Sequence, residues 1–284
     1  MNNSDFYIGW QAQAPASIAR HIKRVIVLIV VSMVVIGLLL ARSQKKFSTA
    51  NFEFGSLTQV TGFYFNKPVP SIKAEQGTDR FGNKTYVTIP LVGFGKFGAE
   101  GVMDILEKEQ GTSLNQKELT LKGTLLYNDG KLLMQIDEND KPLISVGKMA
   151  DITSIPVQKE LGTVMLRGEI VDPKCFFGVM KPGEGKVHKD CAIRCILGGI
   201  PPVLRVQNEK GEANYYLLVG PQGEKMNEAV KDLVAEPVEI EARAVQQGDW
   251  IILYAGKEKM KQISKRELFF PELQVVACIT NCSK

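Results

Sequence analysis

The sequence predicts a mostly β protein in which one N-terminal transmembrane helix precedes two tandem small β-barrels, each with one helix. An uncharged apolar run lies near the N-terminus, and the remainder alternates apolar and polar residues between Gly, Pro and Asn-Asp turns. The same order of predicted elements then occurs twice. The 284 residues, 44% hydrophobic and 23% charged, exclude a disordered, collagen-like or coiled-coil chain.

The apolar run covers residues 25–41 and contains no charged side chain. A helix of this length spans about 25 Å, close to the hydrocarbon thickness of a bilayer. The run therefore predicts an anchor helix between an N-terminal tail (1–24) and a linker (42–50). A cleaved signal peptide is the alternative, because the Ala-Arg-Ser tripeptide at 41–43 loosely matches a small-x-small cleavage site.

The basic residues that flank the apolar run do not orient the helix. Three precede it and three follow it closely, so the positive-inside count is a tie. The short N-terminal tail and the large C-terminal part favour a single-pass signal anchor. We therefore expect the β domains on the periplasmic or extracellular side of the cytoplasmic (inner) membrane.

The two predicted units have matching layouts. The first unit (51–155) contains strands at 57–65, 68–72, 85–93, 119–127 and 131–136, with a helix at 100–110. The second unit (156–256) contains strands at 163–171, 200–206, 215–220, 238–245 and 250–254, with a helix at 224–234. Five strands with a helix between the third and the fourth predict OB-like barrels, a different small sandwich or meander being the alternative. A C-terminal extension (257–284) follows, and the basic segment 256–268 predicts another helix.

Charge and motifs exclude two classes of ligand. Outside residues 1–42 the acidic and basic residues nearly balance, whereas a barrel that binds single-stranded nucleic acid needs a basic groove with stacking aromatic residues. We therefore expect no nucleic acid partner. The Gly-rich segment 93–98 follows a strand, but the helix after it begins too late for a phosphate-binding loop.

An insertion in the second unit has no counterpart in the first and carries Cys175, His188, Cys191 and Cys195. The last three are spaced by three and four residues, so a helix would place them on one face. Cys175 can return over a Pro-Gly-Glu-Gly loop as a fourth ligand. Three thiolates and an imidazole form a tetrahedral set for zinc, and soft sulfur would also suit copper.

Other uses of the cysteines stay open. Exported domains oxidise their thiols, and Cys278 and Cys282 near the C-terminus could be a mutual pair or extra ligands. These two could instead join Cys191 and Cys195 in two disulfides or in a four-sulfur metal site. A nucleophilic pair of Cys191 with His188 is also conceivable, but the sequence assigns no catalytic residue.

The insertion also carries a longer motif, formed by Asp172, Cys175, His188, Cys191-Ala192, Cys195 and Gly199-Ile200-Pro201. It resembles the Val-Asp…Cys…His-x-x-Cys-Ala-x-x-Cys…Gly-x-Pro motif of a family of uncharacterised exported bacterial proteins with an OB-like β-barrel. The resemblance covers residues 162–256 only. It implies an exported bacterial setting and a single Cys/His site, and it implies no established activity.

Together these features predict a membrane-anchored, exported binding or assembly module with a structural, zinc-like Cys3His site. Such a module would serve as an accessory subunit that contacts a protein partner in a membrane complex. Two alternatives remain: a periplasmic redox or copper-handling protein that uses the same thiols, and a disulfide-stabilised scaffold without metal.

Overall fold

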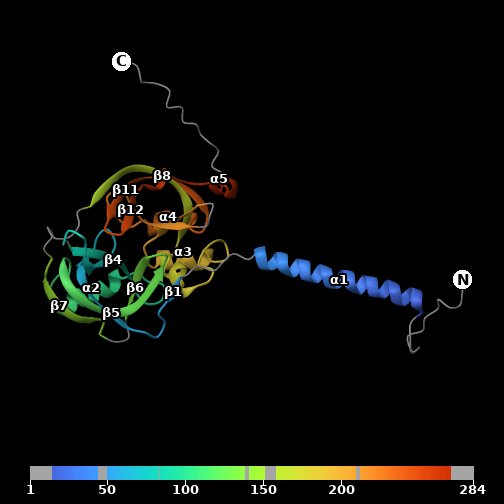
Figure 1. The fold of residues 1–284 in the computed structure, drawn as a ribbon. Helices are drawn as coiled ribbons and strands as arrows, with labels where there is room; N and C mark the ends of the chain where they lie inside the picture. Colours follow the sequence, from blue (N-terminus) through green and yellow to red (C-terminus); the bar gives the residue numbers. More distant parts are fainter. Residues whose placement is uncertain are drawn as a thin grey trace, which may run out of the picture. The chain divides into compact units, whose positions relative to one another are not determined.

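The computed structural model describes residues 15–43, 50–82, 84–137, 141–150, 158–208 and 212–269 (Figure 1). The chain divides into two units, Met1–Phe47 and Ser48–Lys284. Residues 1–14 of the predicted N-terminal tail (1–24) lie outside the described residues, and residues 16–24 form the start of a helix. Cys278 and Cys282 also lie outside them, so their predicted roles stay predictions.

The N-terminal unit consists of one helix, α1 (Ala16–Ser43). Its 28 residues correspond to about 42 Å of helix, and no residue in it is buried within the protein. The helix is long and apolar enough to cross a membrane, and a signal sequence near the N-terminus would share these properties. It begins before the predicted run because Arg and Lys are good helix formers.

The first barrel is closed by five strands: β2 (Thr58–Phe65), β3 (Ser71–Thr78), β4 (Lys84–Val92), β5 (Lys117–Asn128) and β6 (Lys131–Ile136). They pair in the order β2–β3–β4–β6–β5–β2, and the β4–β6 pair is parallel. Helix α2 (Glu100–Gln110) joins β4 to β5, as predicted. Two further strands, β1 (Asn51–Phe52) and β7 (Leu143–Met149), pair with β5.

The second barrel repeats this topology with β8 (Lys159–Val171), β9 (Val203–Gln207), β10 (Ala213–Val219), β11 (Pro237–Gln247) and β12 (Trp250–Tyr254). The strand β10 pairs in parallel with β12, and β8 closes the barrel against β11. Helix α4 (Asn227–Val230) and the turn η4 (Lys231–Leu233) lie between β10 and β11. The predicted fold class, two tandem small barrels of OB-type topology, is confirmed.

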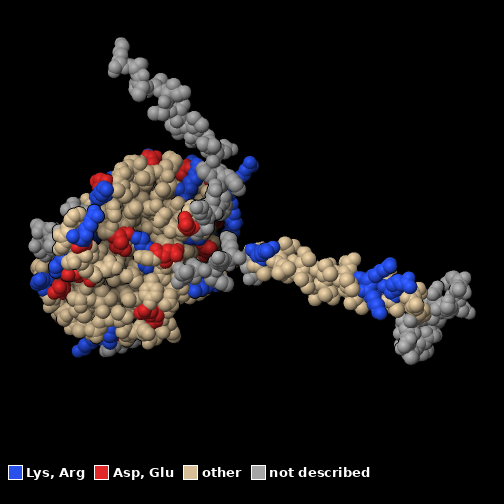
Figure 2. All heavy atoms as spheres, viewed as in Figure 1, with Lys and Arg blue, Asp and Glu red and all other residues tan. Residues whose placement is uncertain are grey.

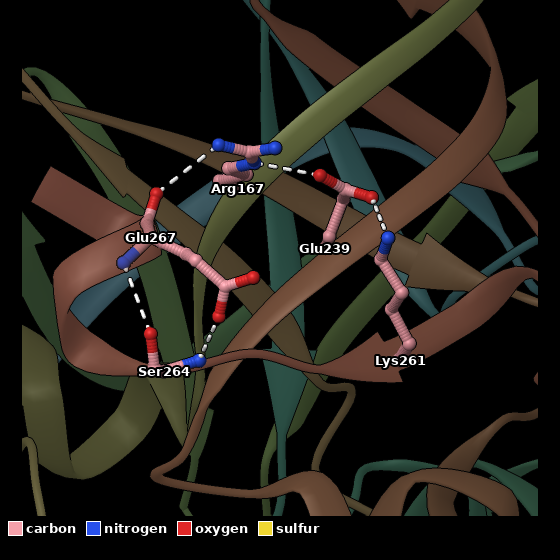
Figure 3. A network of polar contacts seen from close by, with 5 residues as sticks. All are labelled: Arg167, Glu239, Lys261, Ser264 and Glu267. Atoms are coloured by element: carbon pink, nitrogen blue, oxygen red, sulfur yellow. Dashed lines mark hydrogen bonds and ion pairs between the residues drawn. The ribbon is translucent and has the colours of Figure 1, made fainter. Parts of the chain in front are cut away.

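The chain after the second barrel differs from the expected helix over 256–268. It forms a turn, η5 (Lys257–Lys259), a strand, β13 (Met260–Gln262), and only then a helix, α5 (Lys265–Phe269). The strand forms because Met260 is buried while its neighbours face solvent, which lets this segment extend the sheet beside β11. Ser264 and Glu267 cap α5 reciprocally through side-chain and main-chain hydrogen bonds (Figure 3).

Three apolar clusters hold the barrels together. One fills the first barrel and another the second. The third combines residues of both barrels, including Val92 and Leu126 from the first and Trp250 from the second. On the face of the barrels visible in Figure 2, acidic and basic side chains are interspersed, as expected from the balanced composition.

Candidate metal centre

The connection between β8 and β9 carries all the predicted ligands. Cys175 begins a short π-helical turn, η3 (Cys175–Val179). His188 is the residue that precedes helix α3 (Lys189–Leu197), and Cys191 and Cys195 lie on that helix. The helix predicted from the three- and four-residue spacing is therefore present.

The ligand atoms converge in two overlapping groups that share Cys175. One nitrogen of His188 and the sulfurs of Cys175 and Cys191 lie within 4.8 Å of one another. The sulfurs of Cys175 and Cys195 and a carboxylate oxygen of Asp172 also lie within 4.8 Å of one another. Tetrahedral zinc places such ligands about 3.5–3.8 Å apart. The two groups share Cys175, and no single group among the described residues contains all four predicted ligands.

The site is buried around its histidine. His188 is 3% exposed, Cys175 and Cys195 are buried, and Cys191 is half-buried. The Nε2 atom of His188 has no hydrogen-bond partner among the described residues, although buried polar atoms are usually bonded. A buried imidazole with one nitrogen near two sulfurs, and with Nε2 lacking a partner among the described residues, fits a metal ligand.

The three cysteines of the described part, Cys175, Cys191 and Cys195, are free thiols. They therefore do not form disulfides with one another in this structure. The alternative pairing of Cys191 and Cys195 with the C-terminal cysteines involves residues outside the described ranges and stays a prediction.

The surroundings shift the pKa values of two ligands. A hydrogen bond with Cys195, burial and the charge of Asp172 raise the pKa of the Cys175 thiol. Burial lowers the pKa of His188, and nearby Lys96 lowers it further while Asp172 opposes the shift. A neutral imidazole is the form that binds metal, whereas Cys175 would need a cation beside it to stay a thiolate.

The first barrel supplies one wall of the site through its Gly93–Gly98 loop. Lys96 Nζ lies 3.6 Å from the sulfur of Cys191. The buried Lys174 Nζ donates hydrogen bonds of 2.7 Å to the main-chain oxygens of Gly93 and Gly95. The segment that sequence reasoning rejected as a phosphate-binding loop therefore covers the Cys/His cluster.

Sequence reasoning missed three charged residues of the site. Asp172 stood in the motif but was not assigned as a donor, and it lies beside the thiols with Oδ1 accepting a 2.9 Å bond from the main-chain nitrogen of Lys174. The position of Lys174, next to Cys175, could have drawn attention to it. No sequence pattern connects Lys96 with Cys191, because 95 residues separate the two.

Aromatic side chains line the inner side of the site. Phe176 and Phe177 follow Cys175 and are buried. Phe177 stacks on Trp250 with ring centroids 6.4 Å apart and meets Tyr215 edge-on at 5.2 Å. An apolar shell of this kind limits solvent access and fixes the position of the adjacent ligand.

Comparisons with known proteins give no family or relative. A scan against protein-family models finds no match to this chain, and a search of curated proteins finds none either. The assignment of a function therefore depends on the chemistry of the Cys/His site and on the architecture around it.

Proposed function

We propose that this protein is a bacterial membrane-anchored module that displays its two barrels outside the cytoplasmic membrane and contributes to a membrane protein complex. A structural zinc ion bound by Cys175, His188, Cys191 and Cys195 would stabilise the module. One nitrogen of His188 lies within 4.8 Å of the sulfurs of Cys175 and Cys191, and this convergence on a buried imidazole is the observation that carries the metal assignment. Four protein ligands leave no open position, which is typical of structural rather than catalytic zinc.

The charges around the ligands support a divalent ion. Metal binding would convert the three thiols to thiolates, and Asp172 adds a carboxylate beside Cys175 and Cys195. The ammonium group of Lys96, 3.6 Å from the sulfur of Cys191, balances one of these negative charges. A divalent zinc ion would offset most of the rest, and buried charges are tolerated only when they are compensated.

The assembly role rests on α1 and on apolar side chains beside the metal site. Phe94 and Phe97, on the loop that carries Lys96, are 53% and 65% exposed, and Val187 next to His188 is 85% exposed. Exposed apolar side chains of this size favour a protein–protein contact. The partner we propose is another subunit of the same membrane complex.

Elemental analysis of the full-length protein, purified in detergent under reducing conditions, tests the metal assignment. We expect one zinc per chain after dialysis and its loss in His188→Ala. His21→Ala is the matched control, because it removes the other histidine of the chain and should retain zinc. Zinc-free wild-type protein, or equal zinc in both variants, would contradict the proposal. Loss of zinc in a Cys278→Ser/Cys282→Ser double variant would favour the arrangement with C-terminal ligands.

Protease accessibility tests the proposed topology. In spheroplasts of a bacterium that expresses the full chain, externally added protease should degrade the barrels while cytoplasmic marker proteins survive. Protection of the barrels until the membrane is lysed would place them in the cytoplasm. Recovery of a chain lacking residues 1–41 would instead support cleavage of α1 as a signal peptide.

A copper-handling role is the second candidate, and the shared position of Cys175 favours it. Two three-donor groups that meet at one sulfur could hold two copper(I) ions, with Cys175 as the bridging thiolate. Titration of the metal-free, reduced protein separates the candidates: zinc should saturate at one ion per chain, whereas tight binding of two copper(I) ions would favour copper handling.

A further inference from the structure

We infer that Lys96 of the first barrel is a positioning residue of the metal centre, and that metal binding thereby strengthens the docking of the two barrels. The inference rests on the proposed metal site. It adds a residue that lies outside the Cys/His motif and gives the site a regulatory consequence.

The first support is the contact between Lys96 Nζ and Cys191 Sγ, at 3.6 Å. Cys191 is the half-buried cysteine of the three, so Lys96 lies at the solvent-facing edge of the cluster. Cysteine binds metal as a thiolate. In the metal-bound state the contact of Lys96 with Cys191 therefore joins groups of opposite charge, which attract each other.

The second support is that both ends of the ligand-bearing segment (174–198) form hydrogen bonds with the same loop of the first barrel, residues 93–98. At one end, Lys174, next to Cys175, bonds to the main-chain oxygens of Gly93 and Gly95. At the other end, the main-chain nitrogen of Gly98 donates a 3.0 Å bond to the oxygen of Gly198, which follows α3.

The close packing around the hydrogen bond between Gly98 and Gly198 leaves no room for a side chain on either glycine. A Cβ atom on Gly198 would lie 1.9 Å from the oxygen of Lys96, and one on Gly98 would lie 2.3 Å from the oxygen of Gly199. The main chains of the two barrels are thus in direct contact beside the cluster. A movement of α3 that separates Cys191 and Cys195 from Cys175 would therefore disturb this contact between the barrels.

Metal binding and docking of the two barrels must strengthen each other to the same extent, because the two equilibria are thermodynamically linked. If docking of the Gly93–Gly98 loop places Lys96 against the metal-bound thiolate, docking raises the affinity for metal, and metal must favour docking by the same factor. Without metal, the barrels depend on their shared apolar cluster and on the hydrogen bonds between them.

Zinc affinity, measured by chelator competition on the full-length protein, tests the role of Lys96. We expect Lys96→Met to bind zinc about tenfold more weakly, at the low end for a residue that supports metal ligands, because Lys96 is exposed. Lys96→Arg, which keeps the charge, should stay close to wild type. Lys225→Met is the matched control: it removes an inter-barrel lysine paired with Glu100 at 2.8 Å and should leave zinc affinity unchanged.

Amide hydrogen exchange tests the effect on docking. The Gly98 amide, bonded across the interface, should exchange about tenfold faster once zinc is removed, in line with the affinity change. The Met103 amide, bonded within α2, is the internal reference and should not change. Wild-type zinc affinity in Lys96→Met, or Gly98 exchange independent of zinc, would overturn this inference alone. Wild-type protein without any bound metal would overturn the proposed function as well.

Discussion

The indole nitrogen of Trp250, in β12 of the second barrel, donates a 3.1 Å hydrogen bond to the main-chain oxygen of Thr88, in β4 of the first. The main-chain nitrogen of Thr88 in turn donates a 2.8 Å bond to the carboxylate of Asp249. Trp250 is fully buried and stacks on Phe177, two residues after Cys175. The barrel interface and the metal centre therefore share one layer of side chains.

Replacing Trp250 with Phe should destabilise the protein by about 2–4 kcal/mol, because the variant loses buried volume and leaves the oxygen of Thr88 unpaired. Urea unfolding followed by circular dichroism measures the change. Ile105→Ala, at a 57% exposed position of α2, is the control and should shift stability by less than about 0.5 kcal/mol. Equal effects of the two substitutions would refute the proposed contribution of Trp250.

Gly198→Ala and Gly101→Ala should change thermal stability in opposite directions. The methyl group at 198 would collide with the oxygen of Lys96, so we expect a loss of about 1–3 kcal/mol. Nothing lies within 4 Å of a Cβ at 101, inside α2, and alanine should add about 0.5–1 kcal/mol there. Thermal unfolding of both variants checks the sign. A neutral Gly198→Ala would show that the barrels are less closely docked than described.

The ion pairs around Glu239 should make stability depend on pH. Hydrogen bonds from Lys261 and Arg167, both 2.6 Å long, hold the pKa of this buried carboxylate below its ordinary value (Figure 3). Their contribution is complete above the ordinary carboxyl pKa and is lost as the pH falls through the lowered pKa of the folded state. Glu239→Gln should therefore cost about 1–3 kcal/mol at pH 7, with a smaller difference in acid.

Glu241→Gln is the matched control for Glu239, since both residues lie on β11. Glu241 pairs with Lys259 at 3.0 Å, but both side chains are about half exposed to solvent, which screens the pair. Its loss should cost less than about 1 kcal/mol at pH 7. Urea unfolding at several pH values compares the two variants, and parallel pH profiles for wild type and Glu239→Gln would contradict the prediction.

In the metal-free, reduced protein, Cys191 should react with iodoacetamide before Cys175 and Cys195. Cys191 is half-buried, whereas the other two are 5% and 2% exposed, and reagent access limits alkylation. Peptide mass spectrometry after a brief pulse should show at least about tenfold more label on Cys191. Bound zinc should suppress all three reactions, and urea should make the three rates similar. Preferential labelling of Cys195 would contradict the burial described for α3.

Local patterns predicted most of the individual elements. The period-two alternation located most of the barrel strands, and α2 occupies the predicted residues 100–110. The predicted strand 68–72 overlaps β3 only at Ser71 and Ile72. The spacing of His188, Cys191 and Cys195 placed these residues on or beside one helix. These predictions succeeded because they depend on the side-chain periodicity of helices and strands, which the sequence displays directly. The segment 256–264 was predicted as a helix because its many charged residues obscured the buried Met260, which makes β13 a strand.

What the sequence determined by itself is most of the barrel elements, the apolar helix, the repeat and the ligand types of the candidate site. Only the tertiary structure decided that Lys96 lies against Cys191, that Asp172 joins the thiols, and that Trp250 bonds to Thr88. An alternating pattern shows which face of a strand is buried, but not which distant segment buries it. Contacts across 95 or 162 residues arise from barrel closure and docking, which no local pattern encodes.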